Sequence, residues 1–196
     1  LLEPMDIGSP TAQDCRVEAL DSEYPILNRL VTQSVNVDEL DYLAKRLDSF
    51  CQGESEKFQA MASKLGLSDI KDFINLTFSC QQATVITDFT KLEQAGKDHA
   101  LTINGGGMPV DAFEKVDGLS VALDLIQSGT GTVTPYGVAY GNGMKLEQVY
   151  DGRHFPAFYY EDRMAAVALS LPGQEGKEML YFPCPDSKIT RAVQRL

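Results

Sequence analysis

Three neighbouring segments decide the fold class: NVDELDYLAKRLDSF at 36–50, ESEKFQAMASKLGL at 54–67 and SDIKDFINLTFSC at 68–80. In each segment, apolar residues recur at the three- and four-residue spacing of one helical face. The inward-facing set is expected to be Leu40, Leu43, Ala44, Leu47 and Phe50, then Phe58, Met61, Ala62 and Leu65, then Ile70, Phe73, Ile74 and Thr77. Because the links between the segments are only a few residues long, they predict a compact helical unit rather than a coiled coil.

Polar residues mark where these helices begin and end. Asn36 followed by Glu39 is a variant of the capping box that starts a helix. Gly66 fits the C-terminal cap of the second helix, and Ser68 fits the N-cap of the third. Residues 1–35 precede them as an irregular lead-in with one short strand.

The rest of the chain changes character near Ser128. Before it, the pattern predicts a short strand at 83–87 and helices near 89–99, 109–116 and 119–127. After it come strands on both sides of the turn Gly141-Asn142-Gly143, then AFYY (157–160), MAAVALSL (164–171), EMLYFP (178–183) and a terminal helix at 187–196. We therefore predict an α+β fold, with a helical subdomain at 36–127 followed by a mainly antiparallel sheet subdomain at 128–196.

The charge of the chain limits its partners. Its 196 residues include 28 acidic and 17 basic side chains, a net charge of −11. A protein of this sign is repelled by nucleic acids and by anionic membranes, and it is attracted to basic protein surfaces. Cysteine occurs only at positions 15, 51, 80 and 184, without a C-x-x-C pair. That usage favours reduced thiols and a cytoplasmic location over a disulfide-rich secreted scaffold.

No local motif predicts catalysis or a cofactor. The glycine pairs at 129–131 and 141–143 lie beside strand-like sequence and lack the P-loop Gly-Lys-Ser/Thr, so they predict turns. His99 and His154 have no second histidine or cysteine at metal-ligand spacing. Distant residues such as Cys184 and His154 could form a Cys–His nucleophile, but nothing local marks either residue as activated. We therefore expect no enzyme, no cofactor and no metal.

Two further groups are open to two interpretations each. The aromatic residues Phe155, Phe158, Tyr159 and Tyr160 form either a recognition surface or one face of a half-buried strand. The second group consists of acids that avoid the apolar stripes of the helices: Asp38, Glu39, Asp41, Asp48, Glu54, Glu56, Asp69 and Asp72. They form either an ordinary solvated face or an array that imitates DNA phosphates, although Lys45, Arg46 and Lys57 interrupt it.

The helical segments also resemble the core of ArdA-type antirestriction proteins, which conjugative plasmids and transposons encode. The resemblance covers about 36–100 and is carried by Leu40, Leu43, Ala44, Leu47, Phe58, Ile70, Phe73 and Leu76. It implies an elongated acidic homodimer that mimics bent B-form DNA and occupies the DNA site of type I restriction–modification enzymes. It also implies that the eight acids bind this partner and that the protein has no catalytic residue.

The sequence thus leads to two hypotheses. The first is an antirestriction protein that acts as an acidic DNA mimic towards a basic DNA-binding protein. The alternative is a non-enzymatic accessory protein of a conjugative mobile element that binds another protein through residues 128–196. The chain begins without methionine and ends inside a predicted helix, which is typical of a fragment of a longer protein.

Overall fold

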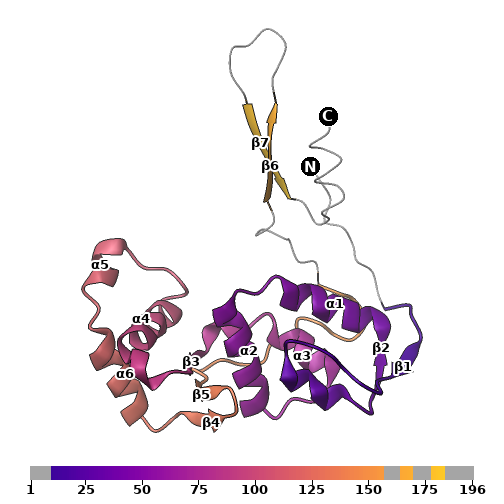
Figure 1. The fold of residues 1–196 in the computed structure, drawn as a ribbon, viewed down its shortest axis with the longest axis horizontal. Coiled ribbons are helices and arrows are strands. Elements are labelled where there is room, and N and C mark those ends of the chain that lie inside the picture. Colours follow the sequence, from indigo (N-terminus) through magenta and orange to yellow (C-terminus); the bar gives the residue numbers. More distant parts are fainter. Residues whose placement is uncertain (1–9, 157–163, 170–177, 184–196) are drawn as a thin grey trace. The chain divides into compact units, whose positions relative to one another are not determined.

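The computed structural model of the chain describes residues 10–156, 164–169 and 178–183. These residues belong to two compact units, one spanning Gly8–Phe155 and the other made of Leu1–Ile7 and Pro156–Leu196. Helices and short antiparallel strands alternate along the first unit (Figure 1), so the predicted α+β class is confirmed. In chain order its elements are β1 (Asp14–Arg16), the 3-10 helix η1 (Pro25–Leu30), β2 (Ser34–Asn36), α1 (Val37–Asp48), α2 (Gln52–Lys64), α3 (Ile70–Leu76), η2 (Cys80–Gln82), β3 (Thr84–Ile86), η3 (Phe89–Lys91), α4 (Leu92–Ile103), α5 (Val110–Glu114), α6 (Gly118–Gln127), β4 (Thr132–Thr134) and β5 (Gly137–Tyr140).

The main core of this unit lies where α1, α2, α3 and η1 meet. Phe58 of α2 and Phe73 of α3 are fully buried, and their ring centroids lie 6.1 Å apart. Tyr24, which precedes η1, packs edge-on against Phe58 at 6.0 Å. Since burying one large apolar side chain stabilises a fold by about 1.5–3 kcal/mol, this cluster rather than helix propensity holds the short helices together.

Most of the predicted inward positions are buried. This holds for Ile70, Phe73 and Ile74 in α3 and for Thr77 at its C-cap, for Phe58, Met61 and Ala62 in α2, and for Leu43 and Leu47 in α1. Leu40 and Phe50 are half-buried. The prediction is wrong for Leu65, which is 41% exposed just after α2 ends, and for Ala44, which is exposed on α1.

The predicted helix ends are largely confirmed. The Asn36 side chain accepts a hydrogen bond of 3.0 Å from the N–H of Asp38 and so caps α1. Gly66 follows α2 with a φ of +68°, a left-handed conformation that glycine adopts without steric cost. The N-cap of α3 is Asp69 rather than the predicted Ser68. Aspartate competes well for this position because its carboxylate accepts from the first free N–H groups of the helix.

A three-stranded antiparallel sheet combines strands from both predicted subdomains. Its strand order is β3–β5–β4, so β3 from among the helices pairs with β5 from the predicted sheet half. β1 and β2 form another antiparallel pair ahead of α1. The prediction of a helical half followed by a sheet half is therefore wrong. The hairpin turn also lies between Thr134 and Gly137, where β4 meets β5, and not at 141–143.

Residues 141–155, which we call the strap, follow β5 without forming a helix or strand and pack against α1 and α3. Asn75 of α3 is fully buried and fastens the strap through the backbone of Tyr150. The Tyr150 N–H donates to Asn75 Oδ1 at 2.7 Å, and Asn75 Nδ2 donates to the Tyr150 carbonyl at 3.1 Å. The ring of Phe155 stacks between Tyr42 and Tyr150, with centroid distances of 4.7 and 5.1 Å. Phe155 is thus a core residue.

Helices α4 and α6 pack through glycine. A Cβ atom added to Gly96 of α4 would lie 1.8 Å from the carbonyl oxygen of Gly118 in α6. In the reverse direction, a Cβ on Gly118 would lie 2.0 Å from the carbonyl oxygen of Glu93. Ala100 and Ala122, one turn further along each helix, are also buried. Small residues at a four-residue spacing on both helices therefore allow the two backbones to touch.

The second unit contains β6 (Met164–Leu169) and β7 (Glu178–Pro183), which pair antiparallel with Leu169 opposite Glu178. Both strands were predicted from the sequence. The predicted strand at 157–160 and the predicted helix at 187–196 lie outside the described residues. Within the described part of the chain, no helix is long and apolar enough to cross a membrane.

Candidate functional site

The acids predicted to bind a partner mostly lie at the N-terminal ends of helices. Asp38 and Glu39 are in the first turn of α1, Glu54 is in the first turn of α2, and Asp72 is in the first turn of α3. These ends carry the positive pole of the helix dipole, so a carboxylate there stabilises the helix. A part of the acidic surface is therefore explained by folding alone.

Asp38 holds the lead-in to β1 against the start of α1. Its carboxylate accepts hydrogen bonds from the N–H of Thr11 at 2.7 Å and of Ala12 at 2.9 Å. These backbone donors, Ala12 first, lower the pKa of Asp38 below its usual value of 3.8. Asp38 is thus a structural anchor for residues 11 and 12.

The pKa of Glu39, the next residue, is shifted in the opposite direction. The Glu39 side chain is half-buried, and it accepts a hydrogen bond of 2.7 Å from the hydroxyl of Tyr150. Burial raises the pKa of Glu39 above its ordinary 4.5; the Tyr150 hydroxyl lowers it in part, and the nearby carboxylates of Asp69 and Asp14 raise it further. Glu39 therefore joins α1 to the strap at the cost of a partly desolvated charge.

We expect Asp38→Asn and Glu39→Gln to change stability in opposite directions. The lowered pKa of Asp38 stabilises the fold above pH 3.8, and that contribution is lost as the pH falls through the folded pKa. The raised pKa of Glu39 means that its ionised form costs stability above pH 4.5, and the cost disappears at lower pH. In urea titrations at neutral pH, Asp38→Asn should lower the midpoint, whereas Glu39→Gln should keep or raise it.

The two differences should both shrink in titrations below pH 4. If both substitutions shift the urea midpoint in the same direction at neutral pH, the opposite pKa shifts of Asp38 and Glu39 are contradicted.

The remaining predicted acids are distributed over several places. Asp41 forms an exposed ion pair with Lys45 at 2.5 Å, and Glu56 accepts a hydrogen bond from Gln52 at 3.2 Å. Glu54 accepts from the N–H of Cys51 at 3.0 Å and completes a capping box at the start of α2. Asp48 lies on the rim of a groove along α1, near Tyr24.

Four basic side chains near the α1–α3 group donate hydrogen bonds to backbone oxygens. Arg29 donates to the carbonyls of residues 62 and 67 at 3.1 and 2.9 Å, and Arg46 donates to the carbonyl of residue 77 at 3.0 Å while covering the ring of residue 78. Lys57 reaches the carbonyl of residue 81 at 3.3 Å and a threonine hydroxyl at 3.1 Å, and its burial lowers its pKa. Lys64 reaches the carbonyl of residue 139 at 3.1 Å. Four cationic side chains thus donate hydrogen bonds to backbone carbonyl groups of the first unit.

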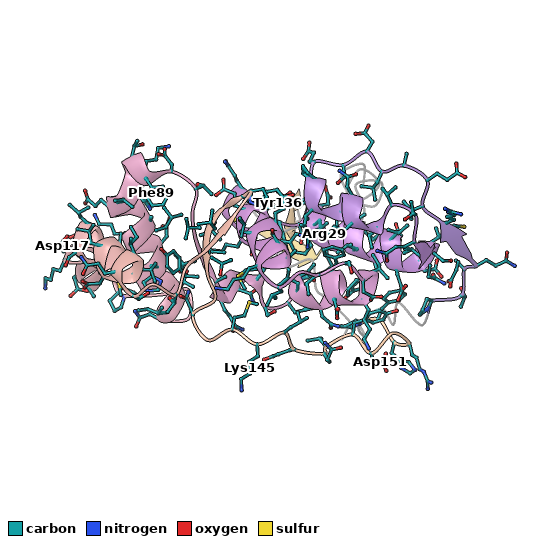
Figure 2. The ribbon with its side chains drawn as sticks, turned by 90° about the horizontal axis from the view of Figure 1, so that it is seen from below. Arg29, Phe89, Asp117, Tyr136, Lys145 and Asp151 are labelled. Carbon is teal, nitrogen blue, oxygen red and sulfur yellow. The ribbon has the colours of Figure 1, made fainter. Side chains whose placement is uncertain are left out.

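These contacts include two of the basic residues that interrupt the acidic array in the sequence. Arg46 and Lys57, which interrupt the acidic array in the sequence, donate hydrogen bonds to the backbone carbonyls of Thr77 and Gln81. Figure 2 shows Asp151 beside the helices α1–α3 and Asp117 at the tip of the α4–α6 group, so acidic side chains extend over both parts of this unit.

A groove of about 690 Å³ runs along α1. Its apolar lining comes from Leu27, Leu40, Leu43, Ala44, Leu47 and Phe50. Ala44 is exposed because it faces this groove. Tyr24 forms part of the wall, and its hydroxyl is fixed by the carbonyl of Leu47 at 3.0 Å and by Ser55 Oγ at 2.9 Å.

The rim of this groove is acidic. Asp21, Glu23 and Asp48 contribute three exposed carboxylates, and no lysine, arginine or histidine is among the described lining residues. Asp21 and Glu23 were not among the predicted site residues. Their position in the irregular lead-in gave no periodic signal, and only the path of the chain into η1 brings them beside Asp48.

A buried thiol and two histidines lie among the described residues. Burial raises the pKa of the Cys80 thiol to about 12, which keeps it protonated. His99 Nδ1 lies 2.8 Å from the hydroxyl of Thr84, and burial lowers its pKa. His154 contacts Asp151 at 3.3 Å on the surface. Across residues 10–156 and the two strands of the second unit, no three metal-ligating side chains come together, and Cys184 lies outside the described residues.

No protein-family model, no curated protein and no solved structure matches the chain. Its function therefore has to be inferred from its own charge, contacts and shape.

Proposed function

We propose that this chain is a non-enzymatic acidic decoy that binds the DNA-contacting surface of a basic protein, as an antirestriction protein does with a restriction–modification enzyme. The observation that carries the proposal is the excess of acids on the surface of the first unit, where Asp41, Asp48 and Asp69 are exposed. Arg29, Lys57 and Lys64 donate hydrogen bonds to backbone carbonyl groups of the unit, so part of its basic charge is held against backbone oxygens. Exposed carboxylates are the groups that a cationic partner would contact.

The net charge of the described first unit supports the same conclusion. Residues 10–156 carry 21 acidic and 12 basic side chains, a net of −9. Of the eight predicted acids, Asp41, Glu56 and Asp72 have no contact with a backbone N–H among the described residues, and they are the best candidates for contact with a partner. Attraction between such a surface and a DNA-binding cleft is long-ranged and weakens as salt screens it.

The test is inhibition of a purified type I restriction enzyme by the full 196-residue chain over a salt series. Inhibition should be strong at low salt and should weaken at least about tenfold between roughly 50 and 200 mM salt. The triple variant Asp41→Asn, Glu56→Gln, Asp72→Asn should lose a further factor of about ten and should depend less on salt.

The matched control is Asp111→Asn, Glu114→Gln, Asp124→Asn on α5 and α6, which removes the same charge from exposed positions elsewhere. It should inhibit nearly as well as the parent. If the folded parent does not inhibit at any salt concentration, the decoy role is wrong, and the accessory role of a mobile-element protein becomes the hypothesis to pursue. Equal losses in both triple variants would show that total charge acts and that the α1–α3 acids have no special part.

A further inference from the structure

We propose that the groove along α1 binds a cationic amphipathic helix of the partner protein. The inference rests on the proposed function and names the part of the basic partner that is held. It is drawn from an apolar floor and from a rim whose charged residues, among the described lining, are Asp21, Glu23 and Asp48.

The floor has the spacing of a helix-in-groove site. Leu40, Leu43 and Leu47 follow one another along one side of α1 and all line the groove, with Leu40 half-buried and Leu43 and Leu47 buried at its base. Exposed Ala44 lies between them and leaves space where a larger side chain would close the groove. A partner helix can place large apolar residues at i, i+3 or i+4, and i+7 over such a floor. A volume of about 690 Å³ is in the range of pockets that hold several side chains.

One wall of the groove is held rigidly by the fold. Tyr24 is bound at its hydroxyl by the Leu47 carbonyl and by Ser55, and its ring packs on the buried Phe58. The opposite side is α1 itself, which is capped by Asn36 and anchored by Asp38. Since neither side has to be ordered on binding, little conformational entropy is lost by the protein.

The rim determines the charge of the occupant. Asp21, Glu23 and Asp48 surround the apolar floor, and the described lining has no basic side chain. Lysine or arginine residues on the flanks of a bound helix would lie against these carboxylates, whereas phosphate groups of a nucleic acid or an anionic lipid would be repelled. A basic helix with one apolar face is the occupant that satisfies both the floor and the rim.

The experiment is a fluorescence-anisotropy titration of the full chain with a labelled amphipathic helical peptide of about four turns, built from leucine and lysine. The same peptide with glutamate in place of lysine is the charge control. We expect the cationic peptide to bind, with an affinity that falls as salt rises, and the anionic peptide to bind at least about tenfold more weakly.

Ala44→Arg should weaken binding of the cationic peptide at least about tenfold, because it fills the groove and adds a like charge. Gln127→Arg, which adds the same charge at an exposed position of α6, should leave binding unchanged. Asp21→Asn with Glu23→Gln tests the rim at exposed positions without touching the helix and should flatten the salt dependence.

The inference is overturned if the folded parent does not bind the cationic peptide, if both peptides bind equally, or if the two arginine variants lose binding to the same extent. Sedimentation of the parent and of Ala44→Arg checks for a second copy of the chain; a dimer abolished by this substitution would make that copy the occupant and overturn the inference. Inhibition of the restriction enzyme without peptide binding would leave the decoy role standing and reject the groove. Peptide binding without inhibition of the enzyme would support the groove and reject the decoy role.

Discussion

Gly118→Ala is expected to lower the free energy of unfolding of the first unit by at least about 3 kcal/mol, at the upper end of the usual cost of overpacking. The added Cβ would meet the carbonyl oxygen of Glu93 at 2.0 Å. Backbone atoms cannot move away by changing a rotamer, so α4 and α6 would have to separate. Gly96→Ala should behave in the same way, because its Cβ would meet the carbonyl oxygen of Gly118 at 1.8 Å.

Gly53→Ala is the matched control for this prediction. Gly53 is also in a helix, but no atom lies within 4 Å of the position of its Cβ. There the substitution should be neutral or should stabilise by up to about 1 kcal/mol, because alanine has the higher helix propensity. Urea denaturation of the three variants at neutral pH measures the effect. Equal midpoints for Gly118→Ala and Gly53→Ala would refute the close backbone packing of α4 and α6.

Asn75→Ala is expected to destabilise the first unit by about 2–5 kcal/mol, since two buried backbone groups lose their partners. These groups are the N–H and the carbonyl of Tyr150, which Asn75 holds at 2.7 and 3.1 Å. Without the amide, the strap can regain hydrogen bonds only by moving towards water. Amide hydrogen exchange should therefore accelerate along residues 141–155 more than in α2.

Tyr150→Phe separates this backbone contact from the side-chain contact of the same residue. It removes only the hydroxyl that donates to Glu39 at 2.7 Å. The expected loss is about 0.5–1.5 kcal/mol, the usual net value of one hydrogen bond. The Asn75 interpretation fails if Asn75→Ala leaves the exchange rate of the Tyr150 amide unchanged, or if Tyr150→Phe is the more damaging substitution.

The helices could be predicted because their signals are local. Apolar spacing located α1, α2 and α3, and Pro109 predicted the start of α5, where it is the N-cap. The strand order could not be predicted in the same way. β3 and β5 contain only a few residues each, and Thr84 pairs with Tyr140 far along the chain. Nothing in the neighbourhood of either strand specifies its partner, so the local pattern does not predict that β3 belongs to this sheet.

The candidate site shows the same division between local and distant contacts. Carboxylates at helix starts were recognisable in the sequence, but their partners were not. Glu39 meets Tyr150 only because the strap returns over α1, and Arg29 reaches the end of α2 from a separate 3-10 helix. Arg29 and Lys64 donate to carbonyl groups of residues that are distant in the sequence, so the partners of a charged side chain do not follow from the order of residues.

The pairing of β3 with β5 has a consequence for synthesis of the protein on the ribosome. α2 packs against both strands, with the Met61 side chain near Gly141, so its inner face is complete only after residue 140 has emerged. At about 5–20 residues per second, the 52 residues from Ile86 to its partner Val138 take roughly 3–10 seconds to translate. During that interval the side of α2 that contacts β4 and β5 lacks its final partners, while its other side can already pack on α3 and η1. Rare codons between β3 and β5 would lengthen this interval.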